Sequence, residues 1–532
     1  MIINSKLLKC IVVLFSFIVC FPAFSFAAEK KNEANISESN KEYLPLNQDQ
    51  LLKKICAKNF DIIYQKYDLE LASEQIKKEK AIFEPKFNAA YNYKDSLHPN
   101  NAEEFYNRSY MGTMETFKER VSKYQFALTG LLPTGTVYSL DYTIDEVDND
   151  LVDTKYQGSL NKEAASHLGV QITQPLLKNI GIKNTEIKIR IAKATQNISY
   201  QGYRQKIIDV VHQALNVYWE LYYTSRQYEI YKDSVQIAKN LLQTYSEMVE
   251  AGKVAETELF EVKSGLALRR SLLSAAHQKQ IAAQNSLFQL LGKSRLNNQI
   301  KHYIPIDAPT LHETNDKISY DEVLKQALMY NPRYLSSLIN LEKQNIHVEH
   351  AKNQCLPELN FKANAYIESL DSRPELFWEN IWNDNDESWS MGLEFSMPLT
   401  GGLDTKSELR ISKIRKKQAI LSLQSIKVNL ENEIDTAIQS IHNARIQVER
   451  HTENVKLKQK IMNIEMNKLE GGRSNIIDVL EKEKNLNQAR NGKLRAIVNL
   501  ELSGVLLRRI DGTLTQRYGI EIDENDFSKN AK

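Results

Sequence analysis

The side chains with the greatest catalytic potential in this sequence form no familiar catalytic or metal-binding pattern. There is no glycine-rich phosphate loop, no HExxH segment and no paired CxxC motif. His347, Glu349 and His350 lie close together on a predicted helix and could suggest a metal site, but this spacing is more typical of a solvated helix face. We therefore expect no catalytic residue, no metal and no cofactor, and a protein that is not an enzyme.

A second group with chemical potential is the acidic pair Asp478 and Glu481, which follows Gly472. Residues at i and i+3 lie on one face of a helix, so both carboxylates would present their charge on the same side. The pair is either an ordinary solvated helix face or a fixed negative patch, and the residues alone leave both readings open.

The start of the chain has the features of a secretory signal peptide. A basic start precedes an uncharged run from Cys10 to Phe21, and Ser25 and Ala27 fit cleavage after Ala27. A membrane anchor is the alternative, but the run is shorter than the roughly 20 residues that a spanning helix needs. Lipid attachment at Cys20 is a further alternative, which the bulky Val19 disfavours.

The composition favours long helices and argues against several classes of protein. The chain has 19 Gly and 12 Pro among 532 residues, about half of the roughly 12% share that is ordinary. A net charge of +2 argues against a general nucleic-acid binder. Cys56 and Cys355 are too few for a disulfide scaffold. No segment after the start has 18 consecutive apolar residues, so an exported chain of this kind could enter a membrane only as a β-barrel.

Five landmarks recur in the same order in the two halves of the chain, which predicts a tandem duplication. The pairs are Asn59 and Asn331, Pro85 and Pro357, Pro175 and Pro398, Gly252 and Gly472, and Gly292 and Gly512. The predicted organisation is a signal peptide (1–27), an N-terminal linker (28–42), a first repeat (43–300), an inter-repeat linker (301–317), a second repeat (318–515) and a polar C-terminal tail (516–532).

Each repeat is predicted to contain a helix, a strand, a loop, a strand, a long helix and a third helix. The expected helices cover about 47–83, 183–248 and 255–291 in the first repeat, and about 319–355, 403–470 and 474–508 in the second. A long helix of roughly 66 residues would reach about 100 Å. The two shorter helices of a repeat, stacked end to end, would match it in length.

The third helix of the first repeat carries an apolar seam. Ten positions between 259 and 290 follow a 3-4 spacing, and all are apolar except Arg269 and Gln280. The spacing is typical of coiled-coil packing, although an ordinary long bundle explains it equally well.

An extra β-hairpin is predicted in the first repeat at about 122–146. Tyr124, Phe126 and Leu128 alternate with small or polar residues, and the same alternation resumes after a turn at 133–135. Every predicted strand has one apolar face and one small or polar face, which suits either a soluble sandwich or an outer-membrane barrel. In a barrel, the side chains on the polar faces would point into the water-filled interior; these are Gln171, Thr173, Glu394 and Ser396.

This order of elements resembles the TolC-type outer-membrane efflux proteins over about residues 43–515. The resemblance is carried by the duplication, by "TQPLL" at Thr173–Leu177, by Pro398–Leu399, and by the turns at 251–253 and 471–473. It implies a mainly α-helical fold with a membrane β-barrel: a homotrimer in which the helices form an α-barrel tunnel and the strands share one outer-membrane barrel.

The resemblance also implies a function. The protein would be the outer-membrane exit duct of a tripartite efflux or type I secretion system, in a Gram-negative-type cell with its helices in the periplasm. Its partners would be a periplasmic adaptor protein, an inner-membrane transporter and outer-membrane lipid. Adaptors would dock at the tips near Gly252 and Gly472, and Asp478 and Glu481 would line the pore constriction as a ring of carboxylates.

The gate of the family is implied to lie in the same region. The positions that correspond to its Tyr, its Arg and its acidic partner are Leu469, Ser474 and Glu258, and only Glu258 keeps the expected residue type. Arg473 is adjacent and could substitute for the missing Arg. We therefore expect the location of the gate to be shared, but not its chemistry.

Two other functions compete with the channel. A periplasmic adaptor also uses helical hairpins, but it usually has one hairpin flanked by β-domains. A secreted coiled-coil structural protein would not need strands with a lipid-facing side.

Overall fold

The computed structural model describes residues 43–108, 115–155, 163–293, 302–309, 318–371, 378 and 386–520. The chain divides into Met1–Tyr43 and Leu44–Lys532, and apart from Tyr43 every described residue belongs to the second unit. The predicted signal peptide (1–27), the N-terminal linker (28–42), most of the inter-repeat linker and residues 521–532 of the predicted tail lie outside the described residues.

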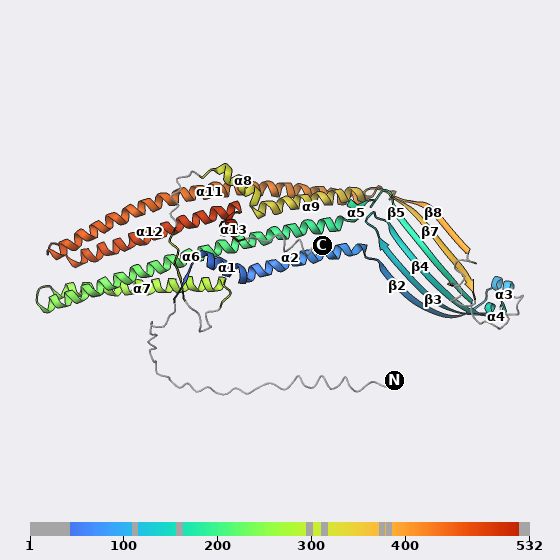
Figure 1. The fold of residues 1–532 in the computed structure, drawn as a ribbon, viewed down its shortest axis with the longest axis horizontal. Coiled ribbons are helices and arrows are strands. Elements are labelled where there is room, and N and C mark those ends of the chain that lie inside the picture. Colours follow the sequence, from blue (N-terminus) through green and yellow to red (C-terminus); the bar gives the residue numbers. More distant parts are fainter. Residues whose placement is uncertain are drawn as a thin grey trace, which may run out of the picture. The chain divides into compact units, whose positions relative to one another are not determined.

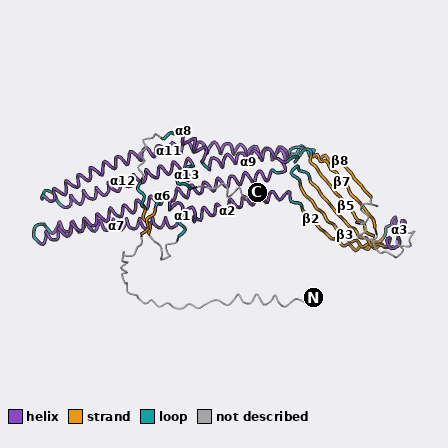
Figure 2. The backbone as a smooth tube through the Cα atoms, in the orientation of Figure 1, coloured by secondary structure: helices purple, strands orange, loops and turns teal. Residues whose placement is uncertain are grey.

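Long helices dominate both halves of the chain (Figure 2). In the first half the helices are α1 (Gln48–Lys58), α2 (Phe60–Lys80), α3 (Ala102–Arg108), α4 (Asp150–Lys155), α5 (Ile182–Thr185), α6 (Ile187–Glu250) and α7 (Glu256–Leu290). In the second half they are α8 (Tyr320–Tyr330), α9 (Pro332–Gln354), α11 (Leu403–Glu470), α12 (Ile476–Asp511) and α13 (Leu514–Arg517). α6 has 64 residues and α11 has 68, close to the predicted lengths.

The long helices pack as two hairpins, α6 with α7 and α11 with α12. Figure 1 shows the turns of both hairpins at one end and the large sheet at the other. Each long helix extends beyond its hairpin partner. Helix α2 packs along this additional part of α6, and α9 packs along the additional part of α11. None of the described helices is both long and apolar enough to cross a membrane.

The first helix of each half is broken, although the sequence predicted continuous helices over 47–83 and 319–355. Asn59 separates α1 from α2 with an extended backbone, and its side chain accepts hydrogen bonds from the N–H groups of Asp61 and Ile62. Asn331 caps α9 in the same way. The prediction was wrong because an Asn side chain can replace the backbone acceptors that a new helix start lacks.

The same two asparagines join the short helices end to end. The Asn59 side-chain amide donates to the carbonyl of Leu290, the last residue of α7, at 3.3 Å. The Asn331 amide donates to the carbonyl of Ile510, near the end of α12, at 2.8 Å. Each amide therefore satisfies a carbonyl that the end of a helix leaves without an intrahelical partner.

The described strands form two sheets. The small sheet pairs β1 (Tyr43–Leu46) with β6 (His302–Pro305). The large sheet has the order β2-β3-β4-β5-β7-β8, with every pair antiparallel. Its strands are β2 (Lys86–Pro99), β3 (Thr116–Leu131), β4 (Val137–Asn149), β5 (Glu163–Pro175), β7 (Glu358–Asp371) and β8 (Asp386–Ser396). β3 and β4 form a hairpin over the segment where the extra one was expected, and they extend beyond 122–146.

The main core surrounds the middle of α6. Tyr218 and Trp219 are almost fully buried there, among apolar residues of α1, α7 and α12. The Tyr218 hydroxyl donates to the Asp307 carboxylate at 2.8 Å, and its oxygen also lies 3.1 Å from the Leu46 carbonyl oxygen. This tyrosine therefore fixes the small sheet and the following segment against α6, because a buried hydroxyl requires such partners.

Candidate functional site

One face of the large sheet is apolar and exposed across all six strands. Strand pairing places one residue of each strand in a continuous row, and all six members are exposed: Phe87, Leu128, Leu140, Val170, Ala365 and Trp389. An exposed apolar surface of this extent is unusual for a face that contacts water, so it marks an interaction surface.

The opposite face of the sheet is small and polar. Ion pairs join neighbouring strands on this face, with N–O distances of 2.8 Å for Lys94 and Glu119, 3.3 Å for Lys123 and Asp145, and 2.7 Å for Lys362 and Glu394. Because successive side chains of a strand point to opposite faces, Gln171, Thr173, Glu394 and Ser396 share the face that carries these ion pairs. The two faces therefore suit two different environments.

The turns at the far ends of the helical hairpins are nearly identical. Gly252 and Gly472 both have a left-handed backbone, with φ of +71° and +68°. In each turn the glycine N–H and the next N–H donate back to carbonyls in the last turn of the preceding helix, at 2.8 to 3.0 Å. This helix-ending motif requires a residue that tolerates positive φ, which explains the glycines.

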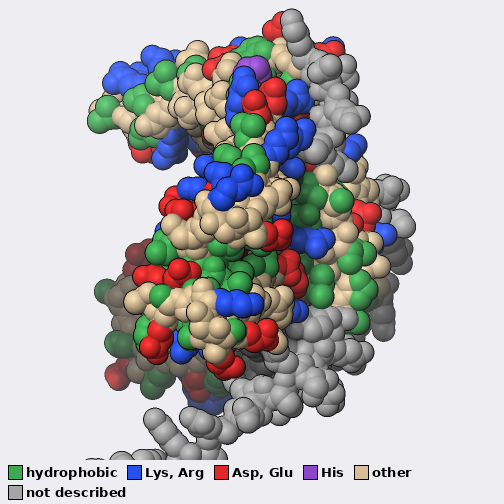
Figure 3. All heavy atoms as spheres, turned by 90° about the vertical axis from the view of Figure 1, so that its left-hand side faces the viewer, with side chains coloured by type: hydrophobic (Ala, Val, Ile, Leu, Met, Phe, Trp, Pro, Cys, Tyr) green, Lys and Arg blue, Asp and Glu red, His purple; other side chains and the backbone are tan. Residues whose placement is uncertain are grey.

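Apolar side chains hold the two hairpins together close to these turns. Tyr245, Leu259 and Val262 of the first half pack against Ile476 and Val479 of the second. Burial raises the pKa of the Tyr245 hydroxyl, with a smaller contribution from the Glu258 carboxylate. Figure 3 views this end and shows acidic and basic side chains interspersed over it.

The predicted constriction pair lies at the start of α12. Asp478 is in the first turn, where its N–H is capped by the Asn475 side chain at 2.8 Å. Glu481 is exposed and lies 3.5 Å from the Lys482 ammonium. The continuous helix keeps both carboxylates on one face, and the lysine offsets part of the charge of Glu481.

The predicted gate residues are not joined to one another in this chain. The Ser474 hydroxyl donates to the Glu465 carboxylate, and this hydrogen bond lowers the pKa of Glu465. Glu258 lies in the first turn of α7. Among the described residues, Arg473 makes no ion pair with Glu258.

A buried ion pair near the predicted constriction was not recognised from the sequence. Arg269 of α7 pairs with Glu483 of α12, and both side chains are more than nine-tenths buried. Ser234 and Asn487 also donate to the Glu483 carboxylate, and Arg269 donates to the Leu480 carbonyl at 3.2 Å. The network therefore links the first half to the second, two residues beyond Glu481.

The sequence did contain an indication of this network. Arg269 and Gln280 are the two polar residues that interrupt the apolar seam of α7. Gln280 also has a polar partner, the Ser225 hydroxyl at 3.3 Å. A cavity of about 430 Å³ adjoins the ion pair between α6, α7 and α12, and Glu481 lines it as well. Arg269, Glu483 and Glu481 therefore surround one space.

On α9, the Glu349 carboxylate that lies between the two histidines is engaged in an ion pair. Glu349 pairs with Arg190 of α6 at 3.3 Å, and burial lowers the pKa of both His347 and His350. In the described part of the chain, no three His, Cys, Asp or Glu side chains are grouped as metal ligands.

The fold is shared with solved outer-membrane channels. The channel OprN matches with a TM-score of 0.63 and 14% identity, over 87% of this chain and 89% of that one. The CmeC outer membrane channel of Campylobacter jejuni matches with a TM-score of 0.60 and 16% identity, over 97% and 98%. The MtrE outer membrane channel of Neisseria gonorrhoeae matches with a TM-score of 0.60 and 13% identity, over 88% and 89%.

The sequence was also compared with known proteins and protein families. No curated protein matches the chain. The pattern of the family described as outer membrane efflux protein matches residues 137–293 and 323–513, which together exceed half of the chain. The resemblance predicted from the sequence is thus confirmed, and the chain belongs to the outer membrane efflux protein family.

Proposed function

We propose that this protein is an outer-membrane channel that gives substrates of a tripartite efflux or type I secretion system a passive exit from the cell. The observation that carries the proposal is the exposed apolar row across six strands, backed by a charged face, at one end of helices of 64 and 68 residues. Lipid would cover the apolar face, and water would fill the space on the other side.

The channel is a homotrimer with one shared barrel. A single sheet leaves β2 and β8 as open edges, and unpaired backbone groups are not tolerated in hydrocarbon. Joining β2 of one copy to β8 of the next, three times, removes every edge. The apolar faces of the three sheets then form a continuous outer surface.

The long helices form a tunnel through the periplasm of a Gram-negative-type cell. At 1.5 Å per residue, α6 and α11 each extend about 100 Å. A periplasmic adaptor docks at the tips around Gly252 and Gly472, and an inner-membrane transporter supplies the substrate. Exposed apolar side chains close to the tips, including Phe260 and Ile477, suit such a contact.

The narrowest part of the tunnel lies at the start of α12. Asp478 and Glu481 line it, and three copies of each concentrate negative charge in a confined space. Glu258, Arg473 and Ser474 belong to the gate region. The buried pair of Arg269 and Glu483 holds α7 against α12 immediately behind this ring.

Cell fractionation of the full chain tests the proposed location and assembly. We expect the protein in the outer membrane, and detergent extracts should contain a trimer that dissociates on heating. A soluble periplasmic monomer would support the adaptor function instead, and release into the medium would support a secreted structural protein. Either result would contradict the channel.

Adjacent residues of β5 provide a matched test of the lipid-facing side. Val170 lies on the apolar face and Gln171 on the polar face. A lysine on a lipid-facing barrel position costs about 2–4 kcal/mol near the bilayer centre. Val170→Lys should therefore lower the amount of trimer in the outer membrane, while Gln171→Lys should not. Equal effects of the two substitutions would count against a membrane role for this sheet.

A further inference from the structure

Helix α2 is apolar on two sides, although only one of them is buried within the chain. The buried side includes Ile62, Leu69 and Ile76, and α6 is the long helix against which α2 packs. On another side, four large side chains are each between 59% and 71% exposed: Phe60, Tyr64, Tyr67 and Leu71. Their 4-3-4 spacing places them in one stripe, which we call the α2 seam. A helix that is apolar on a second side needs a second partner.

A matching stripe lies on the part of α11 that is closest to the sheet. Four of its apolar side chains are between 41% and 64% exposed: Ile411, Ile414, Leu421 and Val428. They follow a 3-4 spacing in which Gln418 and Ser425 occupy the intervening positions. This stripe, which we call the α11 seam, has the periodicity of a coiled-coil contact.

The two seams belong to opposite sides of the chain. Near the sheet, the helices pack in the order α2, α6, α9 and α11. Helix α2 leads into β2 and α11 follows β8, and these are the two edge strands of the large sheet. Figure 1 shows α2 on the side of β2 and α11 on the side of β8. Each seam therefore lies on the helix that adjoins an open edge of the sheet.

We propose that the α2 seam of one chain packs against the α11 seam of the next chain, so that helix pairs as well as the shared barrel join the three copies. This interface rests on the proposed function, in which β2 of one copy pairs with β8 of the next. Because α2 and α11 are joined to these strands by short connections, the strand junction brings the two helices side by side. Apolar seams on both helices then cover each other.

The topology also sets the direction and register of this contact. Helix α2 runs toward the sheet and α11 runs away from it, so the two helices pair antiparallel. Ile82 directly follows α2 and Leu403 begins α11, and both side chains are exposed. Placing Ile82 opposite Leu403 aligns the sheet ends of the two helices. The resulting pairs are Leu71 with Ile414, Tyr67 with Gln418, and Tyr64 with Leu421.

Charged side chains beside the seams match in sign in this register. Glu74 falls next to Arg410, and Lys78 falls next to Glu408. All four side chains are exposed. The ion pairs that Glu74 and Glu408 make within their own helices are exposed as well, and such pairs are weak. Both carboxylates can therefore exchange them for a partner on the neighbouring chain.

The same charges disfavour the next possible register. A shift of one heptad still places apolar residues opposite each other, with Tyr64 opposite Val428. It would also bring Lys78 beside Lys413 and Arg415, where like charges repel. The seam therefore has one preferred register.

Disulfide cross-linking of the full chain in outer-membrane preparations tests both the contact and its register. Leu71→Cys with Ile414→Cys, and Tyr64→Cys with Leu421→Cys, should give covalent dimers and trimers on oxidation. A disulfide requires Cα atoms about 4.4–6.8 Å apart, which these opposed positions satisfy. An intramolecular bridge would not change the mass, so each larger product reports a contact between copies.

The exchanged combinations are the matched controls. Leu71→Cys with Leu421→Cys, and Tyr64→Cys with Ile414→Cys, use the same four exposed positions but separate the cysteines by about 10 Å along the helices. We expect at least tenfold less cross-linked product from them. Cys56 and Cys355 remain in every variant, so the parent chain and the four single variants set the background.

The outcomes separate this interface from the channel itself. The seam is overturned if the exchanged combinations cross-link as efficiently as the opposed ones, or if no combination exceeds the background while the variants still form a heat-dissociating trimer in the outer membrane. The channel proposal would survive either result. A parent chain that forms no such trimer would instead contradict the proposed function, and the seam with it.

Discussion

Arg269 interrupts an apolar seam, and its partner shows why a charged residue stands there. Glu483 lies 214 residues away in sequence and is buried with it between α7 and α12. The interruption is visible in the sequence because the 3-4 spacing continues on both sides. The partner could not be predicted, because local periodicity carries no information about which distant helix packs against the seam.

Removing one partner of the Arg269–Glu483 ion pair should lower the free energy of unfolding strongly, as expected of a buried charge network. Arg269→Met leaves the Glu483 carboxylate buried without its counter-charge, so we expect a loss of about 3–5 kcal/mol in the free energy of unfolding. Adding Glu483→Leu should recover much of that loss, because neither charge then remains. Urea unfolding in detergent, followed by tryptophan fluorescence, measures both.

Arg450→Met provides the control for this comparison. Arg450 pairs with Glu453 on the exposed surface of α11, at 3.4 Å. Exposed pairs contribute about 1 kcal/mol or less, so this variant should unfold almost like the parent. If Arg269→Met were equally harmless, the buried network would not stabilise the junction between the halves.

Cys56 should react slowly with alkylating reagents. Burial raises the pKa of its thiol to about 11, and only the thiolate is nucleophilic. The alkylation rate should therefore rise about tenfold for each pH unit from pH 7 to pH 10, as the thiolate fraction rises. Peptide mass spectrometry after iodoacetamide treatment measures this. A rate that levels off near pH 9, as expected of the urea-unfolded control, would contradict the effect of burial.

At the scale of elements, the sequence predicted the long helices well and their breaks poorly. The scarcity of Gly and Pro correctly indicated helices of more than 60 residues. The breaks at Asn59 and Asn331 were missed because the helical pattern continues on both sides. Pro332, at the first position of α9, was a usable signal for the second break.

The glycines that end helices should differ in their tolerance of substitution. Gly472 and Gly512 both have positive φ, at +68° and +78°. A Cβ at Gly472 would meet nothing within 4 Å, whereas one at Gly512 would lie 2.6 Å from the Tyr330 carbonyl. Gly472→Ala should cost about 1–2 kcal/mol of stability, and Gly512→Ala about 1–3 kcal/mol more. Urea unfolding distinguishes them, and equal costs would show that the contact with Tyr330 is easily relieved.

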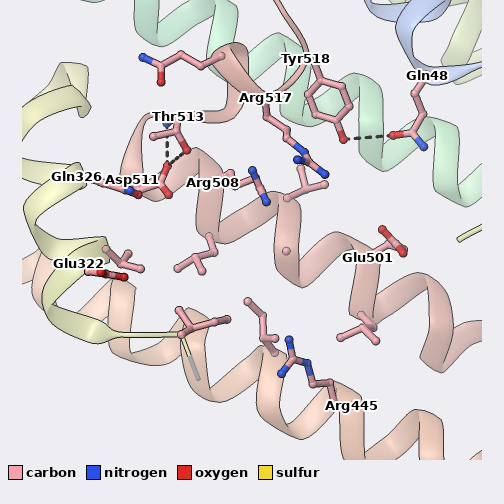
Figure 4. Close-up of a pocket in the computed structure, with 18 of the residues that line it drawn as sticks. Gln48, Glu322, Gln326, Arg445, Glu501, Arg508, Asp511, Thr513, Arg517 and Tyr518 are labelled. Carbon is pink, nitrogen blue, oxygen red and sulfur yellow. Dashed lines mark hydrogen bonds between the residues drawn. The ribbon is translucent and has the colours of Figure 1, made fainter. Parts of the chain in front are cut away.

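At the scale of the whole molecule, the two halves meet in ways that the repeat pattern did not indicate. β5 of the first half pairs with β7 of the second, so a single six-stranded sheet spans the duplication. The alternation of each strand predicted its two faces, but not its neighbour. The cavity of about 1090 Å³ where the start of α1 meets α8, α11, α12 and α13 was equally invisible, because its lining residues come from separate helices that pack together only in the fold (Figure 4).

Conductance of the purified protein in a planar lipid bilayer tests the channel function most directly. We expect discrete, cation-selective conductance steps that polyvalent cations block, because the proposed ring of Asp478 and Glu481 would concentrate negative charge at the entrance. Asp478→Asn with Glu481→Gln should weaken selectivity and block while the trimer stays nearly as stable. A double variant with unchanged selectivity and block would make the pair a solvated helix face, and a parent protein that produced no conductance steps would contradict the channel itself.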